Sequence, residues 1–316
     1  MAETPIEKLL AYRLGKKYTQ CRSIPDRNKV LMGELKEILY AEIETLLRLN
    51  GMINPPFDPF KIKEIGRVPV RVEYAEDVGS HGAIEVAENA FVVKLSKDLL
   101  RSGSKLIVPY RLRSTMAHEL MHTFFYDTSQ NPPRKLGSGL PSRRNLMMQE
   151  ELCYFLARNL LMPTFSIKDQ FTKRNSLKFP SIDNINYLKS RFVASSDLIA
   201  YRLITDLNMW RAIFIKFVKE GNAYRSITML KSKANKFYSS LKIPRSVPSS
   251  SQGEWEKILS EHVLKTAEKR KHKEIAVING QRIVLESALD SRNPMSIMTL
   301  VWTFEKSEST LSDYFD

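Results

Sequence analysis

The sequence contains few cysteines and few histidines. Of its 316 residues, two are cysteines and five are histidines. Because Cys21 and Cys153 lie far apart, they do not make the disulfide framework of a small secreted protein, and they favour a reducing compartment. The first 18 residues carry charges throughout and have no continuous apolar core, so we expect no signal peptide.

Long hydrophobic runs are also missing. No stretch approaches the roughly 18 uncharged apolar residues of a membrane-spanning helix, and residues 154–162 are interrupted by Arg158 and Asn159. We find no internal repeat and no low-complexity tract. The apolar fraction of 43% is nevertheless that of a globular protein with buried cores. We therefore predict a soluble, cytoplasmic protein with no membrane contact.

The chain carries a formal net charge of +14. Such an excess attracts phosphate groups and is therefore compatible with nucleic-acid binding. The basic residues are scattered, however, and their densest cluster is the segment KTAEKRKHK at residues 265–273. A solvated basic surface explains the charge equally well, so both interpretations stay open.

Periodicity and chain breaks predict an α+β protein with four segments. Apolar residues at three- and four-residue spacing predict helices in the first segment, and alternation predicts strands in the second. A Ser-Ser-Asp helix start at 195–197 and an Asn-Gly hairpin signal at 279–280 mark the other two. The four segments are an N-terminal helical part (1–54), a core with a small sheet (55–165), a helical, helix-turn-helix-like part (166–221), and a C-terminal α+β region (222–316). Within the C-terminal region we expect a linker (241–253), a basic helix (254–273) and a β-hairpin (275–285).

The core segment contains its own finer predictions. Strands are expected at 68–74 and 90–95, with a turn or flexible loop at 79–82 between them. Helices are expected at 110–126 and 143–162, and Pro163 ends the second of these. In the following segment we expect helix throughout 181–220, where a recognition helix carrying Tyr201 and Arg202 would read base edges if the segment bound DNA. The many apolar positions of this segment slightly favour the alternative, a helical bundle that packs on the core.

The most informative motif is His118-Glu119-Leu120-Met121-His122 in the first of these helices. Residues four apart lie on the same face of a helix, so the two imidazoles can hold one metal ion. In this H-E-x-x-H arrangement the glutamate acts as general base on a metal-activated water. The motif therefore predicts a catalytic zinc site at which His118 and His122 are ligands and Glu119 is the base.

A catalytic zinc site needs a third protein ligand, and the helix at 143–162 offers Glu150 and Glu151. At 100° per residue, Glu150 falls within an apolar stripe, where an unpaired charge would be costly and a metal would balance it. Glu151 falls on a polar face, but a different helix rotation would favour it. The stripe consists of Leu146, Cys153, Ala157 and Leu160, and the polar face of Arg144, Arg158 and Asn159.

Two motifs resemble the signatures of the ImmA/IrrE metallopeptidases. The first is Tyr110-Arg111-x-Arg113-x-x-x-Ala117-His118-Glu119-x-x-His122, and the second is Glu150-Glu151-x-Cys153-x-x-Leu156-Ala157-x-x-Leu160-Leu161-Met162-Pro163. The chain departs from the second signature at three positions. It has Cys153 where alanine is usual, Leu156 where phenylalanine is usual and Leu152 where an acidic residue is frequent. Weaker similarity extends over residues 55–220.

The resemblance implies a zincin-like, zinc-dependent endopeptidase that cleaves one or a few proteins. Members of the family cleave a helix-turn-helix transcriptional repressor and thereby control stress-response genes. The donor set is also compatible with Mn²⁺. An oxyanion-stabilising donor is expected as well, and Tyr126 and His81 are the candidates.

A rival hypothesis comes from another class of function. The chain would then be a DNA-binding or partner-binding regulatory protein whose metal site is structural or vestigial. The presence of Glu119 favours the enzyme, because a purely structural site needs no base and normally closes its fourth position with Cys or His.

Overall fold

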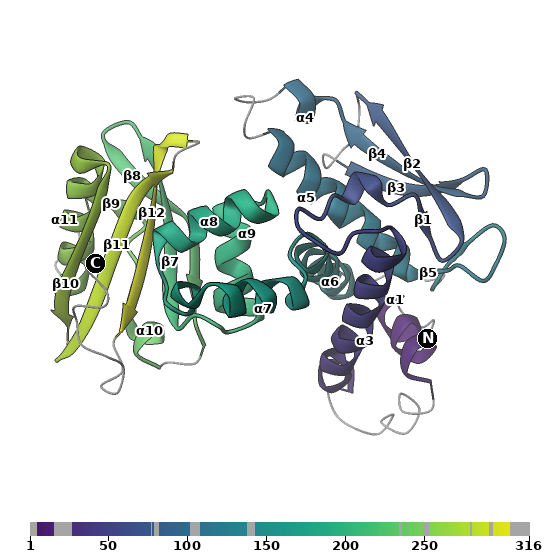
Figure 1. The fold of residues 1–316 in the computed structure, drawn as a ribbon, viewed down its shortest axis with the longest axis horizontal. Helices are drawn as coiled ribbons and strands as arrows, with labels where there is room; N and C mark the ends of the chain where they lie inside the picture. The colour runs from purple at the N-terminus through teal and green to yellow at the C-terminus, as the bar shows by residue number, and fades with distance from the viewer. Residues whose placement is uncertain are drawn as a thin grey trace. The chain divides into compact units, whose positions relative to one another are not determined.

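The computed structural model describes residues 5–15, 27–76, 78, 82–101, 108–137, 143–233, 236–248, 253–278, 280–290 and 293–303. The chain divides into two compact units, Met1–Ile167 and Lys168–Asp316 (Figure 1). Each unit combines helices with its own sheet, which confirms the predicted α+β class. None of the described helices has both the length and the apolar character needed to cross a membrane.

The first unit combines helices with a four-stranded sheet in the order β1-β2-β4-β3. Its strands are β1 (Glu64–Ile65), β2 (Val68–Ala75), β3 (Gly82–Ala87) and β4 (Ala90–Ser96), and a separate pair is formed by β5 (Tyr126–Asp127) and β6 (Arg134–Lys135). Its helices are α1 (Pro5–Leu14), α3 (Arg27–Leu49), α4 (Asp98–Arg101), α5 (Val108–Met121) and α6 (Arg143–Leu161), with 3-10 turns η1 (Pro59–Lys61) and η2 (His122–Phe125). The division between the units falls within α7 (Thr164–Lys173).

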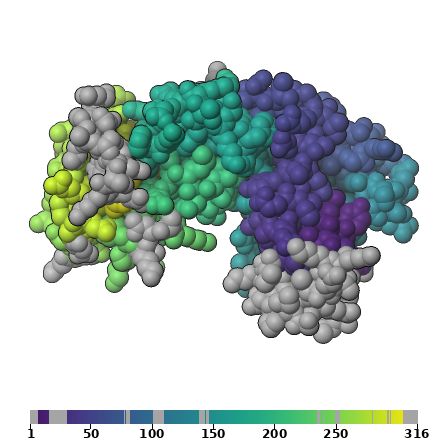
Figure 2. Space-filling model, turned by 60° about the horizontal axis from the view of Figure 1, so that its bottom comes forward, coloured from purple at the N-terminus to yellow at the C-terminus, as the bar shows by residue number. Residues whose placement is uncertain are grey.

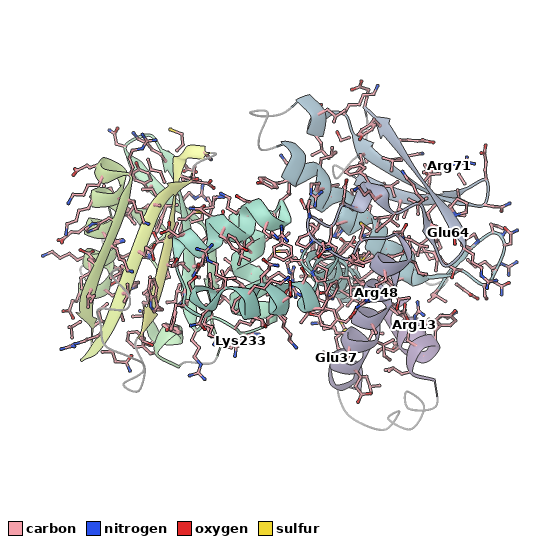
Figure 3. The ribbon with its side chains drawn as sticks, viewed as in Figure 1. Arg13, Glu37, Arg48, Glu64, Arg71 and Lys233 are labelled. Atoms are coloured by element: carbon pink, nitrogen blue, oxygen red, sulfur yellow. The ribbon has the colours of Figure 1, made fainter. Side chains whose placement is uncertain are left out.

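Helices α1 and α3 lie side by side in the first unit (Figures 1 and 2). The predicted helical spacing is confirmed in α3, where Leu31, Leu35 and Leu39 are buried at successive turns. Arg13, labelled in Figure 3, pairs with Glu42 across the two helices at 2.9 Å. Both α1 and α3 also contact α6, so they support the helix that carries the predicted third ligand.

The strand prediction for the first unit is confirmed in part. The expected strands at 68–74 and 90–95 are β2 and β4, which pair in parallel. The expected turn at 79–82 is wrong at Gly82, which begins β3, an antiparallel partner of β4. The short, Gly-flanked segment shows weak alternation, so tertiary pairing with β4 determines its structure.

The second unit is built around a six-stranded antiparallel sheet in the order β10-β11-β12-β7-β8-β9. Its strands are β7 (Ala212–Glu220), β8 (Ala223–Lys231), β9 (Ser246–Val247), β10 (Lys271–Ile278), β11 (Gln281–Asp290) and β12 (Asn293–Thr303). Its helices are α8 (Ile182–Phe192), α9 (Ser196–Ala200), α10 (Lys236–Ser240) and α11 (Glu254–Lys269), with a 3-10 turn η3 (Asn175–Lys178) and a π-helical turn η4 (Tyr201–Asp206).

Helices cover both faces of this sheet. Trp255, Leu259 and Val263 of α11 pack with Leu285 and its same-face neighbours into one apolar cluster. Because side chains alternate along a strand, Glu286 points to the other face. There its carboxylate accepts a hydrogen bond from the backbone N–H of Ile182 at the start of α8, at 3.3 Å.

Three expectations for the second half of the chain need correction. Helix does not extend through 181–220, because residues 212–220 form β7, whose β-branched and aromatic residues favour a central strand. The basic helix ends at Lys269, because Arg270 adopts a left-handed conformation with φ 68° and β10 follows. The expected linker at 241–253 contains β9 and the buried side chains of Leu241 and Val247. The hairpin prediction is confirmed by the β10–β11 pairing.

The helix-turn-helix expectation also changes. Helices α8 and α9 are separated by three residues, but α9 has only five residues before it continues as the π-helical turn η4. Arg202 was expected on a recognition helix, yet its side chain is fully buried and pairs with Asp206 at 3.2 Å. An arginine in this state cannot reach a base edge, so this interpretation of Arg202 is wrong.

A prediction for α3 follows from Gly33. This glycine lies on the exposed face of the helix, and a Cβ atom added there would meet nothing within 4 Å. We expect Gly33→Ala to stabilise the protein by about 0.5–1 kcal/mol, because alanine loses less backbone entropy in a helix. Urea denaturation measures the change, and a loss of stability would contradict this account of α3.

Candidate metal centre

The H-E-x-x-H motif lies at the C-terminal end of α5. The α-helix ends at Met121, the 3-10 turn η2 follows to Phe125, and Tyr126 begins β5, so the prediction of a helix to residue 126 is wrong at its end. Arg113 lies earlier on α5 and belongs to the same signature motif. It is 9% exposed and donates hydrogen bonds to the Phe57 carbonyl oxygen at 2.7 Å and to the Asp58 carboxylate at 3.3 Å. These bonds fix α5 against the segment that leads into the sheet.

Helix α6 packs against α5 and brings Glu150 to both histidines. Glu150 Oε2 lies 3.1 Å from His118 Nε2, and Glu150 Oε1 lies 3.6 Å from His122 Nε2. The two histidine Nε2 atoms are 3.2 Å apart. Three ligand atoms from two helices therefore converge on one point, and this convergence is the central feature of the site.

The spacing of these atoms fits a tetrahedral metal ion. Ligands held about 2.0–2.1 Å from zinc lie about 3.3 Å from one another, close to the separation of the two imidazole nitrogens and to the distance from each of them to its nearer Glu150 oxygen. The protonation states agree as well. Burial lowers the pKa of His122 to about 4, so its imidazole is neutral near pH 7 and can donate a lone pair. The hydrogen bond from His118 lowers the pKa of Glu150, which favours its carboxylate form.

The site is open on the side of Glu150. The side chain of Glu150 is 47% exposed, whereas those of His118 and His122 are 10% and 15% exposed. Among the described residues, the group contains three donor side chains. Three protein ligands with solvent access leave a coordination position for water or substrate, which is the arrangement of catalytic zinc sites.

Two further side chains of α6 contact the histidines. The Tyr154 ring lies 4.1 Å from the His118 ring between centroids, and Cys153 Sγ lies 3.5 Å from His122 Nδ1. Burial raises the pKa of Cys153 well above its usual range, so the thiol stays protonated. Cys153 therefore contacts His122 on the side away from Nε2, and the exposed Tyr154 packs against the His118 ring. Cys153 was noticeable in the sequence only as a departure from the motif that the chain resembles, and no pattern pointed to Tyr154.

Glu119 is held beside the convergent ligands but outside them. It is 6% exposed, and burial raises the pKa of its carboxyl from the ordinary 4.5 to about 7. A carboxyl with a pKa near neutrality can both accept and return a proton, which is what general acid–base chemistry needs. The arrangement can therefore supply a base next to a metal-bound reactant position.

Gly82 explains how the sheet reaches this carboxylate. A Cβ atom at Gly82 would lie 2.8 Å from Glu119 Oε1 and 2.7 Å from Thr115 Cγ2. A real side chain there would force both groups to move. Strand β3 thus lies directly against the face of α5 that carries the base, and this contact was missed in the sequence because 79–82 was interpreted as a turn.

The other residues predicted for the site are Glu151, Tyr126 and His81. Glu151 is exposed and lies outside the group of convergent donors, so it does not serve as the third member of this group. Tyr126 packs its ring edge-to-face on Phe91 at 5.4 Å, and burial raises the pKa of its phenol. This contact favours a packing role for Tyr126. His81 lies outside the described residues.

The predicted faces of α6 need two corrections. Leu146, assigned to the apolar stripe and near the start of α6, is 46% exposed. Asn159, assigned to the solvated face, is 3% exposed. The apolar stripe used to choose Glu150 is therefore confirmed only at Cys153, Ala157 and Leu160, which are buried, whereas the Glu150 side chain is 47% exposed.

The first prediction for the site concerns metal content. Purified wild-type protein supplied with zinc should bind the ion at this group, and His122→Ala and Glu150→Ala should each weaken that binding by about 100-fold or more. Glu151→Ala is the matched control and should bind as wild type does. Competition with a chelator measures each affinity. Weaker binding in Glu151→Ala than in Glu150→Ala would contradict the geometry.

The second prediction concerns metal-free protein and pH. The folded-state pKa of Glu119 is about 7, above its ordinary 4.5, so the folded state holds this proton more tightly than the unfolded state does. Stability should therefore fall as pH rises through this window, by up to about 3 kcal/mol from Glu119 alone. Glu119→Gln should remove this part of the pH dependence. Urea denaturation with EDTA at about pH 5 and about pH 8 compares the two proteins, and parallel pH profiles would contradict the assigned burial effect.

Comparison with known proteins assigns no function to this group of residues. No protein-family model matches the chain, and no curated protein is significantly similar to it. The functional argument therefore rests on the residues of α5, α6 and β3 themselves.

Proposed function

We propose that the chain is a zinc-dependent endopeptidase of the ImmA/IrrE type. The observation that carries the proposal is the buried Glu119 carboxyl beside a three-donor group of His118, His122 and Glu150. A structural metal site has no use for a buried carboxyl outside its ligands, and burying one is costly. A hydrolytic site requires such a group as its base.

The mechanism assigns a separate task to each residue. His118, His122 and Glu150 would hold the metal, which supplies Lewis acidity for a scissile carbonyl and makes a water molecule more acidic. Glu119 accepts the proton from the attacking water and delivers it to the departing amine.

The arrangement of the first unit also suits a peptide substrate. Strand β3 ends the sheet order, so among the described strands it pairs only with β4. An extended peptide can add to such an edge by main-chain hydrogen bonds. Because Gly82 of β3 lies against Glu119, a peptide on this edge would run past the base. Exposed Leu146, Met147 and Tyr154 on α6 offer apolar contacts to substrate side chains.

These features together support a zincin-like core within the first unit. Its metal-binding helix α5 carries the H-E-x-x-H motif, α6 carries the third donor, and an edge strand lies against α5. We further propose, from the resemblance of the two motifs, that the substrate is a helix-turn-helix transcriptional repressor and that cleavage controls gene expression in the cytoplasm.

Replacing the base tests the proposal directly. Glu119→Gln should bind zinc as wild type does and should lose cleavage by about 1000-fold or more, because glutamine cannot take the proton from the water. Zinc-loaded proteins are added to an extract of the source cells, and mass spectrometry of newly formed peptide N-termini compares the two. Glu151→Gln is the matched control. Equal sets of new N-termini in wild type and Glu119→Gln would exclude the mechanism.

Gly82→Ala tests the contact between strand and base. The added methyl group must displace Glu119 or Thr115, so we expect the cleavage rate to fall about tenfold or more while zinc binding is retained. Gly33→Ala serves as the control for an alanine placed where space is free. An unchanged cleavage rate in Gly82→Ala would show that the position of β3 does not matter to the reaction.

A further inference from the structure

The second unit contains another group of two histidines and a glutamate. His262, His272 and Glu274 each offer a ligand atom, and these atoms lie within 4.8 Å of one another. His262 Nδ1 lies 2.7 Å from Glu274 Oε1, and His272 Nε2 lies 3.2 Å from Glu274 Oε2. Four of the five histidines in the chain thus belong to two groups of the same composition.

Local structure brings these three residues together. His262 lies on α11, which packs on the sheet, and β10 follows after the left-handed turn at Arg270. His272 and Glu274 are two residues apart on β10, so they point to the same face of the sheet. That face is the one covered by α11, because α11 contacts β10 and His262 reaches Glu274 directly.

Packing in the core does not account for the polar nitrogen atoms of the His262 imidazole. Its side chain is fully buried, and its Nε2 atom is buried without a hydrogen-bond partner, so Glu274 supplies the one hydrogen bond that the structure shows for this imidazole. Burial lowers the pKa of His262 to about 4, which keeps the ring neutral near pH 7. A neutral imidazole held at a carboxylate, with a second imidazole beside it, is a metal-binding donor set.

We propose that His262, His272 and Glu274 form a second metal site, which binds a divalent transition-metal ion such as Zn²⁺. Each imidazole lies within 3.2 Å of one Glu274 oxygen, and the three ligand atoms lie within 4.8 Å of one another, so small side-chain movements would bring them to the roughly 3.3 Å between tetrahedral zinc ligands. The side chains of His272 and Glu274 are 17% and 25% exposed, so the ion and a water ligand have access from solvent.

Lys265 is the group that competes with a metal here. Its Nζ atom lies 3.5 Å from Glu274 Oε2, and its side chain is 47% exposed. A long, half-exposed lysine can turn to solvent when an ion arrives, and the loss of such a pair costs little. Removal of the lysine charge should therefore leave metal binding intact or strengthen it.

The consequence of the site is a link between helix and sheet. The ion would join α11 to β10, an edge strand of the six-stranded sheet, and metal binding to the folded state alone stabilises that state. This role does not depend on peptidase activity, and it gives the chain two metal ions of different function. The two sites can be tested separately because no residue is shared between them.

The experiment uses full-length protein in which the first site is disabled by His122→Ala and Glu150→Ala together. This double variant should still bind about one zinc ion with a Kd below about 1 µM, measured by titration calorimetry with Zn²⁺. Adding His272→Ala or Glu274→Gln should weaken the binding by about 100-fold or more. Glu274→Gln keeps the size of the side chain, so its loss of zinc cannot be attributed to unfolding.

Two matched controls complete the design. Lys273→Ala alters the neighbouring residue on the opposite face of β10 and should leave zinc binding unchanged, and Lys265→Gln should leave it unchanged or tighter. The visible absorption of Co²⁺ bound to the double variant should show the intensity of tetrahedral coordination. The proposal is overturned if the double variant binds no zinc, or if His272→Ala or Glu274→Gln binds it as tightly as the double variant does.

Discussion

The structure of the first unit depends on the convergence of His118, His122 and Glu150 between α5 and α6. The nearest atoms of two imidazoles and one carboxylate lie within 3.6 Å of one another here, and a positive charge, from a shared proton or a metal ion, is needed to balance the Glu150 carboxylate. The imidazoles supply little of this positive charge, because burial lowers the pKa of His122 and keeps its ring neutral near pH 7. Of the three side chains, Glu150 has the largest exposure. A bound divalent cation satisfies this requirement, and the contacts of α1 and α3 with α6 hold the donors ready for it.

The same buried surroundings determine the pKa of the Glu119 carboxyl. Its carboxyl shares the low-dielectric space beside the donors, so its pKa rises to about 7 without any specific hydrogen bond being needed to explain the shift. Gly82 allows β3 to close over this carboxyl, which excludes water from one side of it. Burial, a missing side chain and an edge strand thus combine to place one proton-transfer group beside one open metal position.

Much of the fold and of the candidate site could be predicted from the sequence, because short-range periodicity determines these parts. The four-residue spacing of His118 and His122, the helix that carries Glu150 and the strands β2 and β4 all follow from local pattern. Strand β3 could not be predicted, since pairing with β4 rather than its own residues decides it. The segment at 212–220 was misread as helix because its apolar residues fit both periods, and only the six-stranded sheet resolves the choice. The grouping of His262 with His272 depends on the turn at Arg270, which no residue pattern indicated.

The central claim is that α5 and α6 together form one metal-binding site with a free base beside it. A crystal structure of the zinc-loaded protein, with anomalous scattering recorded at the zinc absorption edge, tests this claim most directly. The account predicts an anomalous peak bound by His118 Nε2, His122 Nε2 and a Glu150 oxygen, with the Glu119 carboxylate nearby but not coordinated. No anomalous peak between these residues, or coordination through Glu119 in place of Glu150, would contradict it.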